Sequence, residues 1–297
     1  MERPVDLMLS HGEKMTGFSE KQLMAAEREV AARHVGRFPW GSVLWAVLNL
    51  ACWLSLWPLT MMGILPAWAA FLIASANCAL CYLPSHEAQH DIIGRPGSNT
   101  RWLNEAVGHL STIPILLPYR VAKLTHLEHH KHANNPELDP DYGVHADTAL
   151  QSAWQTIRQQ QPGEKTNAYG DALARIGRPE VALDAVIYEL VYYAIMIGLC
   201  WSGHALEAAL IWFLPKHIGL IYIRHYLSWA PHNPGMGKGR YKDTRSFRSA
   251  VGNVLSMGMQ YHIVHHLHPR IPLMRTPRAY WEMRDILKAR GCRLDGL

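Results

Sequence analysis

The stretch Ser42–Pro84 contains no Lys, Arg, Asp or Glu. A helix of about 20 apolar residues crosses a bilayer, so this stretch is long enough for two crossings. Pro66 lies near its middle and is a natural place for a turn, so we predict a helical hairpin of Ser42–Ile64 and Ala67–Leu83. Both spans should be helical because backbone polar groups cannot be left unpaired in lipid.

A second apolar region runs from Ala185 to Tyr222 and is interrupted near Ser202-Gly203-His204. We predict two further spans in it, Ala185–Trp201 and Ala205–Ile223. The predicted fold is therefore an all-α integral membrane protein with about four transmembrane helices in two hairpins. This region is less purely apolar than the first, because it contains the charged residues Glu189, Glu207 and Lys216.

The distribution of Lys and Arg predicts the topology. All of them except Lys216 lie before Ser42, between His86 and Asp184, or after Ile223. By the positive-inside rule, both termini and the central segment should face the cytoplasm. The location that we favour is a bacterial inner membrane. We predict one domain, 1–297, made of an N-terminal segment 1–41, a first hairpin 42–84, a central segment 85–184, a second hairpin 185–223 and a C-terminal segment 224–297.

Two helices are predicted outside the membrane spans. Ser19 and Gln22 have the spacing of a capping box, which indicates a helix that begins there. This helix should lie on the membrane surface or pack on the rest of the domain. Thr276-Pro277 indicates the start of a last helix that ends near Gly291.

The chain contains 18 His, and many of them form three clusters. The first is an HxxxH pattern, and the other two are HxxHH patterns. Residues three and four apart lie on one helical face, so each cluster can direct two or three imidazoles toward one point. All three clusters should lie near the cytosolic surface of the membrane. The eight histidines are His86, His90, His126, His129, His130, His262, His265 and His266.

These eight histidines indicate a metal site rather than scattered surface or core residues. Imidazole is a ligand for Zn, Cu, Fe and Ni. Three or four ligands are enough for one zinc ion, so eight suit two metal ions better than one. The five Cys form no pattern that matches an iron–sulfur site or a zinc finger, and no disulfide framework is implied.

The sequence resembles the membrane fatty acid desaturase superfamily, which includes hydroxylases and carotenoid ketolases. The resemblance covers about Leu83–Pro272 and implies that the clusters bind two iron ions on a helical cap over the four spans. The motifs that carry it are His86-Glu-Ala-Gln-His90, Arg101-Trp-Leu-Asn104, Leu117-Pro-Tyr-Arg120, Thr125-His-Leu-Glu-His-His-Lys-His132, Asn135-Pro-Glu-Leu-Asp-Pro-Asp141 and Gln260-Tyr-His-Ile-Val-His-His-Leu-His-Pro-Arg270.

The resemblance also implies one more iron ligand near the end of the fourth span. We predict His225 for this position, with His232 as the alternative. Other polar residues near the clusters are expected to hydrogen-bond to the ligands and not to bind iron, because a metal-bound His usually donates its second N–H to such a partner. These residues are Asp139, Asp141, His132, His268 and His109.

The resemblance implies an O2-dependent enzyme that introduces a double bond into a fatty acyl chain. The alternative is a hydroxylase or ketolase that acts on a carotenoid or another apolar molecule. The sequence has no Gly-rich dinucleotide motif, no four-Cys cluster and no fused cytochrome b5 motif. We therefore expect a ferredoxin-like, rubredoxin-like or cytochrome b5-like external electron donor with its reductase, and no nucleic-acid partner.

A function of another class is a His-rich metal-binding or transport protein. Transport would require ionisable ligands along a path within the spans. The His clusters lie outside the predicted spans, which argues against transport.

Overall fold

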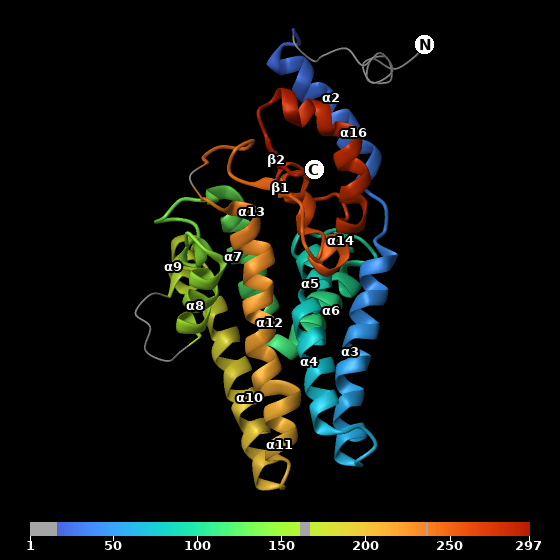
Figure 1. Cartoon of the computed structure of the whole chain (residues 1–297), viewed down its shortest axis with the longest axis vertical. Helices are drawn as coiled ribbons and strands as arrows, with labels where there is room; N and C mark the ends of the chain where they lie inside the picture. Colours follow the sequence, from blue (N-terminus) through green and yellow to red (C-terminus); the bar gives the residue numbers. More distant parts are fainter. Residues whose placement is uncertain (1–16, 161–166, 236) are drawn as a thin grey trace.

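The structure is a computed structural model that describes residues 17–160, 167–235 and 237–297. Among these residues, four helices are long and apolar enough to cross a membrane. They run side by side along the long axis of the molecule (Figure 1), and the protein is mainly helical. The prediction of an all-α membrane protein is confirmed. The four candidate spans are Trp40–Met61, Ala67–Gln89, Pro179–Trp201 and Ala205–His232.

The first hairpin consists of α3 (Trp40–Met61) and α4 (Ala67–Leu80), which continues as α5 (Tyr82–Gln89). Pro66 is the residue before α4 and has an extended backbone, as expected for a turn at this position. The outer faces of the spans expose large apolar side chains such as Leu48 and Leu72, as expected for helices in contact with lipid. The second helix continues beyond the predicted end at Leu83 and carries the first His cluster.

The second hairpin begins with α10 (Ala182–Trp201) and turns at Gly203, which has a φ of 90°. The return helix also continues beyond its predicted end at Ile223 and reaches His232. Two of its segments have π-helical hydrogen bonding. Its segments are α11 (Ala205–Glu207), η4 (Ala208–Phe213), α12 (Leu214–Arg224), η5 (His225–Trp229) and α13 (Ala230–His232).

The two hairpins meet where α12 packs on α4. Gly219 of α12 lies directly against Cys78 of α4, and a Cβ atom at Gly219 would come within 2.7 Å of the Cys78 Cβ. Small residues allow such close contact between membrane helices. This contact joins the helix that carries the first His cluster to the return helix that ends at His232.

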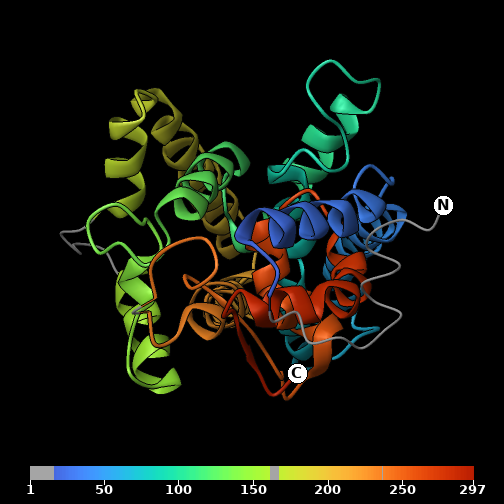
Figure 2. The same ribbon diagram turned by 90° about the horizontal axis from the view of Figure 1, so that it is seen from above.

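The N-terminal and C-terminal helices cover the end of the bundle that carries the His clusters (Figures 1 and 2). The helix α2 (Glu20–His34) begins with the predicted capping box of Ser19 and Gln22. Its apolar face packs on α16 (Thr276–Ala289), so α2 packs on the domain. Next to these helices is a small parallel sheet of β1 (Arg245–Phe247) and β2 (Arg293–Asp295).

Short elements connect the hairpins and carry the second and third His clusters. The central segment contains α6 (Arg101–Ser111), η1 (Ile113–Ile115), α7 (Tyr119–His132), η2 (Tyr142–Val144), α8 (Ala149–Gln159), α9 (Ala168–Arg175) and η3 (Pro179–Val181). The C-terminal segment contains α14 (Gly252–Leu255), η6 (Met259–Tyr261), α15 (His262–Leu267) and η7 (Leu273–Arg275).

We predict that Gly219→Val destabilises the protein by about 1–3 kcal/mol, because the new side chain would be forced into α4. Gly198→Val on α10 is the matched control, since a Cβ at Gly198 meets no atom within 4 Å. Thermal unfolding of the detergent-solubilised protein measures both. Equal losses in the two variants would show that the close contact of α12 with α4 is unimportant for stability.

Candidate metal centre

Three helices that are far apart in the sequence direct their histidines to one region. His86 lies on α5, and His90 directly follows this helix. His126, His129 and His130 lie in the second half of α7, which starts after Pro118. The third cluster lies on α15, which follows a left-handed turn at Gly258. The local helical spacing of each cluster thus allows its rings to meet those of the other two.

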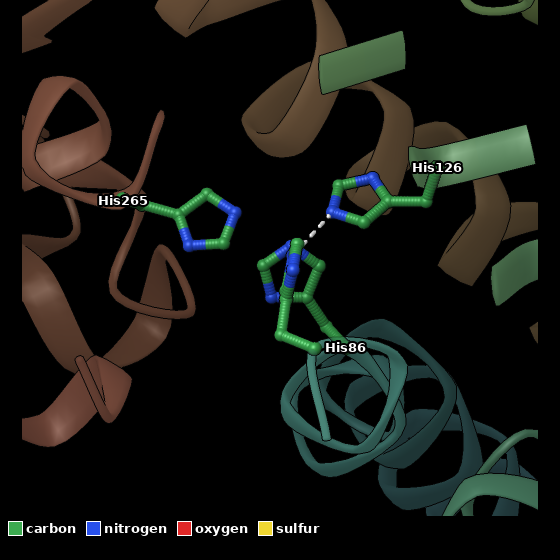
Figure 3. A group of neighbouring side chains, drawn as sticks. His86, His126 and His265 are labelled. Carbon is green, nitrogen blue, oxygen red and sulfur yellow. Dashed lines mark hydrogen bonds between the residues drawn. The ribbon is translucent and has the colours of Figure 1, made fainter. Parts of the chain in front are cut away.

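The first group of histidines consists of His86, His90, His126 and His265. One ring nitrogen from each lies within 4.8 Å of the corresponding atoms of the others. Figure 3 shows His86, His126 and His265 directed toward one another from three separate elements. The Nε2 atoms of His90 and His126 are 2.9 Å apart.

The second group consists of His129, His232, His262 and His266, which also lie within 4.8 Å of one another. The Nε2 atoms of His129 and His232 are 3.1 Å apart. The Nδ1 atom of His129 lies 2.8 Å from the Asp139 carboxylate, and the Nδ1 atom of His232 lies 2.9 Å from the Asp243 carbonyl oxygen. These two contacts leave both Nε2 atoms directed into the group.

His130 lies between the two groups. Its Nε2 atom is 3.1 Å from that of His126 and 3.0 Å from that of His265, both of the first group. Its ring also stacks on His266 of the second group, with 4.2 Å between ring centroids. All eight histidines predicted from the three clusters are therefore brought together.

The donor set fits two metal ions of the kind that imidazole binds. Both ring nitrogens of His86 and His262, Nδ1 of His265 and Nε2 of His266 are buried without a hydrogen-bond partner. Buried nitrogens of this kind are rare unless another group satisfies them. Metal–nitrogen bonds of about 2.1 Å place neighbouring ligand nitrogens about 3.0–3.4 Å apart, which is close to the Nε2–Nε2 separations described above.

The electrostatics of the region favour neutral imidazoles, which are the form that binds a metal. Burial, together with neighbouring histidines, holds the pKa of His126, His265 and His266 well below the ordinary value. His129 differs: burial lowers its pKa, but the Asp139 carboxylate outweighs this effect and raises it to about 9. Asp139 therefore holds a proton on Nδ1 of His129 and leaves Nε2 as the atom that faces the group.

The structure places His232 in the second group and His225 in neither, so our alternative, His232, replaces His225 in the ligand assignment proposed below. His225 stacks on Trp229 with 5.1 Å between ring centroids and belongs to neither group. The reason is the length of the fourth helix. The apolar run predicts a helix that ends at Ile223, but the helix continues to His232 and carries that residue to the level of the other histidines.

Of the residues expected to support the ligands, Asp139 contacts a clustered histidine directly. Asp141 accepts a hydrogen bond from Tyr169 at 2.8 Å, and its backbone N–H donates to Asp139. The other three lie farther out and pair elsewhere: His132 lies 3.6 Å from Glu128, His109 lies 3.3 Å from the Tyr188 hydroxyl and His268 lies 2.9 Å from Glu27.

Two buried carboxylates that the sequence did not reveal hold the clusters in place. Glu87, within the first cluster, accepts a 2.6 Å hydrogen bond from the Leu273 N–H and so ties α5 to the segment after α15. Glu27 of α2 is fully buried and contacts His268 and the Tyr241 hydroxyl, each at 2.9 Å. The sequence gives one sign that Glu27 is buried: it lies among the apolar residues Leu23, Ala26 and Val30 on the buried face of α2.

Comparison with known proteins agrees with this geometry. The profile of the fatty acid desaturase family matches residues 62–296. A beta-carotene ketolase from Paracoccus sp. (strain PC1) is 28% identical over 247 residues, which cover 77% of this chain and 88% of the ketolase. The dihydrorhizobitoxine desaturase of Bradyrhizobium elkanii is 25% identical over 66% of this chain and 61% of its own length.

Relatives named as acyl-lipid desaturases match over shorter segments. The sn-1 acyl-lipid omega-3 desaturase (ferredoxin) of Nostoc sp. (strain 36) is 40% identical over 53 residues, which cover 18% of this chain and 15% of that desaturase. The family profile spans most of the chain and all three His clusters. The chain therefore belongs to the fatty acid desaturase family and is a membrane oxidoreductase with paired histidine groups able to bind metal.

Proposed function

We propose that this protein uses two histidine-bound iron ions and O2 to oxidise an unactivated C–H bond of a long apolar substrate. The observation that carries the proposal is the pair of adjacent histidine groups, whose buried nitrogens face one another at the end of four membrane-length helices. Acid–base side chains alone cannot break a strong alkyl C–H bond, so a metal cofactor has to supply this chemistry. Family membership favours iron over the other metals that imidazole binds.

We assign the ligands from the two groups. His86, His90, His126 and His265 would hold one iron, and His129, His232, His262 and His266 the other, with His130 beside the first. Bound iron supplies the activation of O2. The protein orients the rings through Asp139 and the Asp243 carbonyl oxygen, which fix the Nδ1 sides of His129 and His232.

The first candidate reaction is desaturation of a fatty acyl chain. It is supported by the family profile and by the relatives named as acyl-lipid desaturases. The four membrane-length helices with apolar outer faces support a substrate that resides in the bilayer, as an acyl lipid does. A flexible chain can present two adjacent methylene groups to one site, which double-bond formation requires.

The second candidate is insertion of oxygen into a carotenoid or a similar apolar molecule to give an alcohol or a ketone. It is favoured by coverage: the Paracoccus ketolase aligns over 88% of its length, whereas the Nostoc desaturase aligns over 15%. Both reactions start with removal of hydrogen from carbon. A double bond or an alcohol takes one O2 and two external electrons, and a ketone takes two such rounds at the same carbon. The relative from Nostoc is named for ferredoxin, which supports a small soluble electron carrier here.

The ligand assignment predicts different results for two histidines of the fourth helix. His232→Ala should lose iron, because it removes one nitrogen from the second group. His225→Ala is the matched control. It should keep about two irons per chain, one for each imidazole group, because His225 belongs to neither group. Asp139→Asn should weaken iron binding by about 10–100-fold. Iron content of the purified protein measures all three, and iron loss in His225→Ala with retention in His232→Ala would overturn the assignment.

The two candidate reactions differ in the fate of oxygen. Purified iron-loaded protein is given reduced donor, ¹⁸O2 and, in separate reactions, a saturated acyl lipid or β-carotene. A new double bond without ¹⁸O in the lipid product is expected for a desaturase. An ¹⁸O-labelled alcohol or ketone would replace desaturation by the second candidate. If neither substrate class gave an O2-dependent product, both candidates would be contradicted.

The predicted topology places both termini and the His clusters on the cytoplasmic side of a bacterial inner membrane. Reporter tags at either terminus or after Gln160 should therefore report the cytoplasm, and a tag at Pro66 should report the opposite side. Pro66 lies in the turn between α3 and α4, so a tag there leaves the clusters intact. A tag after Gln160 that reports the outside would contradict this orientation.

A further inference from the structure

One pocket opens onto the histidine groups from the molecular surface. It has a volume of about 430 Å³, lies between the end of α7 and the loop that follows α13, and includes His130 and His266 in its lining. His266 also belongs to the second histidine group. His130, which also lines the pocket, contacts His126 and His265 of the first group, so two imidazole rings connect the pocket with the metal centre.

The rim of this pocket is positively charged. Lys131, Lys238 and Arg240 line it, and the side chains of Lys131 and Arg240 are 64% and 51% exposed. Lys238 is exposed and has no hydrogen-bond or ion-pair partner among the described residues. Asp243, the acid in the lining, has a side-chain oxygen buried from solvent. Lys131 and Arg240 pair with the buried carboxylates of Glu128 and Glu27, so the rim exposes its cations while the acids that pair with them are buried.

The oxidation proposed above consumes electrons. The chain has no recognisable dinucleotide, iron–sulfur or cytochrome b5 motif to supply them. Desaturation takes two hydrogens from the substrate, two electrons from a donor and two protons from water, and it reduces O2 to two water molecules. Hydroxylation takes the same two electrons and two protons and places one oxygen atom in the product and one in water. In either reaction, two one-electron carriers must deliver their electrons close to the metal centre.

We propose that the pocket lined by His130, His266 and Lys238 is the docking site of a small acidic one-electron carrier protein, which passes electrons to the centre through His266. This inference rests on the proposed oxidation but not on which product is formed. Acidic side chains around the carrier's redox group would pair with the basic rim, and such complementary charge fixes orientation and speeds association. The open pocket brings the carrier next to a ring that faces the metal site.

A second basic pocket provides a control. It has a volume of about 290 Å³ and is lined by Arg37, Arg95 and Arg270. Asp91 also lines it and is held by Arg101 and Lys123, each at 2.6 Å. None of the histidines of the two groups is among the described residues that line this pocket. It has similar charge but no ring that leads to the metal centre.

The test compares Lys238→Glu with Arg95→Glu in the iron-loaded, full-length protein in lipid nanodiscs. The carrier is a plant-type [2Fe–2S] ferredoxin, an acidic protein. Lys238→Glu should raise both the ferredoxin Kd, measured without O2 or substrate, and the ferredoxin KM by about tenfold or more at low salt. The difference should shrink as salt screens the charges. Arg95→Glu should change neither, and turnover with dithionite, which needs no docking, should be the same in all three proteins.

Unchanged ferredoxin binding in Lys238→Glu would overturn the proposed docking site, and so would an equal loss in Arg95→Glu. A fall in dithionite-driven turnover in Lys238→Glu would also overturn it, because the residue would then act in the reaction and not in docking. Failure of the oxidation proposal looks different. In that case the parent protein forms no product with dithionite or ferredoxin, whereas its ferredoxin binding still depends on Lys238.

Discussion

Nine imidazoles lie side by side, seven of them buried, and the rest of this structure depends on this arrangement. Each buried ring nitrogen without a hydrogen-bond partner costs about 1–3 kcal/mol, and several such nitrogens occur here within a few ångströms. The rings cannot escape this cost by protonation, because neighbouring positive charges would repel one another. Cations bound between the rings would satisfy the free nitrogens and remove the need for protons. The two groups are therefore best understood as a binding site whose stability is coupled to its metal.

The membrane helices determine where this site lies. Two of the four spans continue beyond their apolar segments as α5 and α13, and these extensions carry His86 and His232. The close contact of Gly219 with Cys78 holds the two helices together, so histidines from different hairpins meet at one level. The elements α7 and α15 are then tied to this frame, the latter through the hydrogen bond from Leu273 to Glu87. The histidine groups are thus held in place by helices of both hairpins and by the elements tied to them.

The sequence predicted the features that depend on local spacing. The three clusters have helical spacings that bring rings to one face, and charge-free stretches identify membrane helices, so both were found correctly. Asp139 follows the second cluster by nine residues and was also expected near it. His232 was ranked second because hydropathy locates where a span leaves the lipid but not where its helix ends. Glu27 was missed because its partners Tyr241 and His268 are more than 200 residues away, and such contacts leave no local pattern.

Glu27 contacts residues next to the histidine groups and on the rim of the proposed docking site. Burial raises the pKa of Glu27, but its bonds with His268 and Tyr241 outweigh burial and bring it below the ordinary value, so the carboxylate is charged. Its partner His268 is two residues after His266, and a third partner, Arg240, lies 3.5 Å away on the rim of the proposed docking site. Arg240 also donates to the Leu267 carbonyl oxygen at 3.0 Å. The same buried charge thus holds the end of α15 and a cation of the rim, and it does so from α2, which precedes the segment matched by the family profile. The N-terminal helix therefore contributes to the geometry of the metal centre and to the charge of the surface above it.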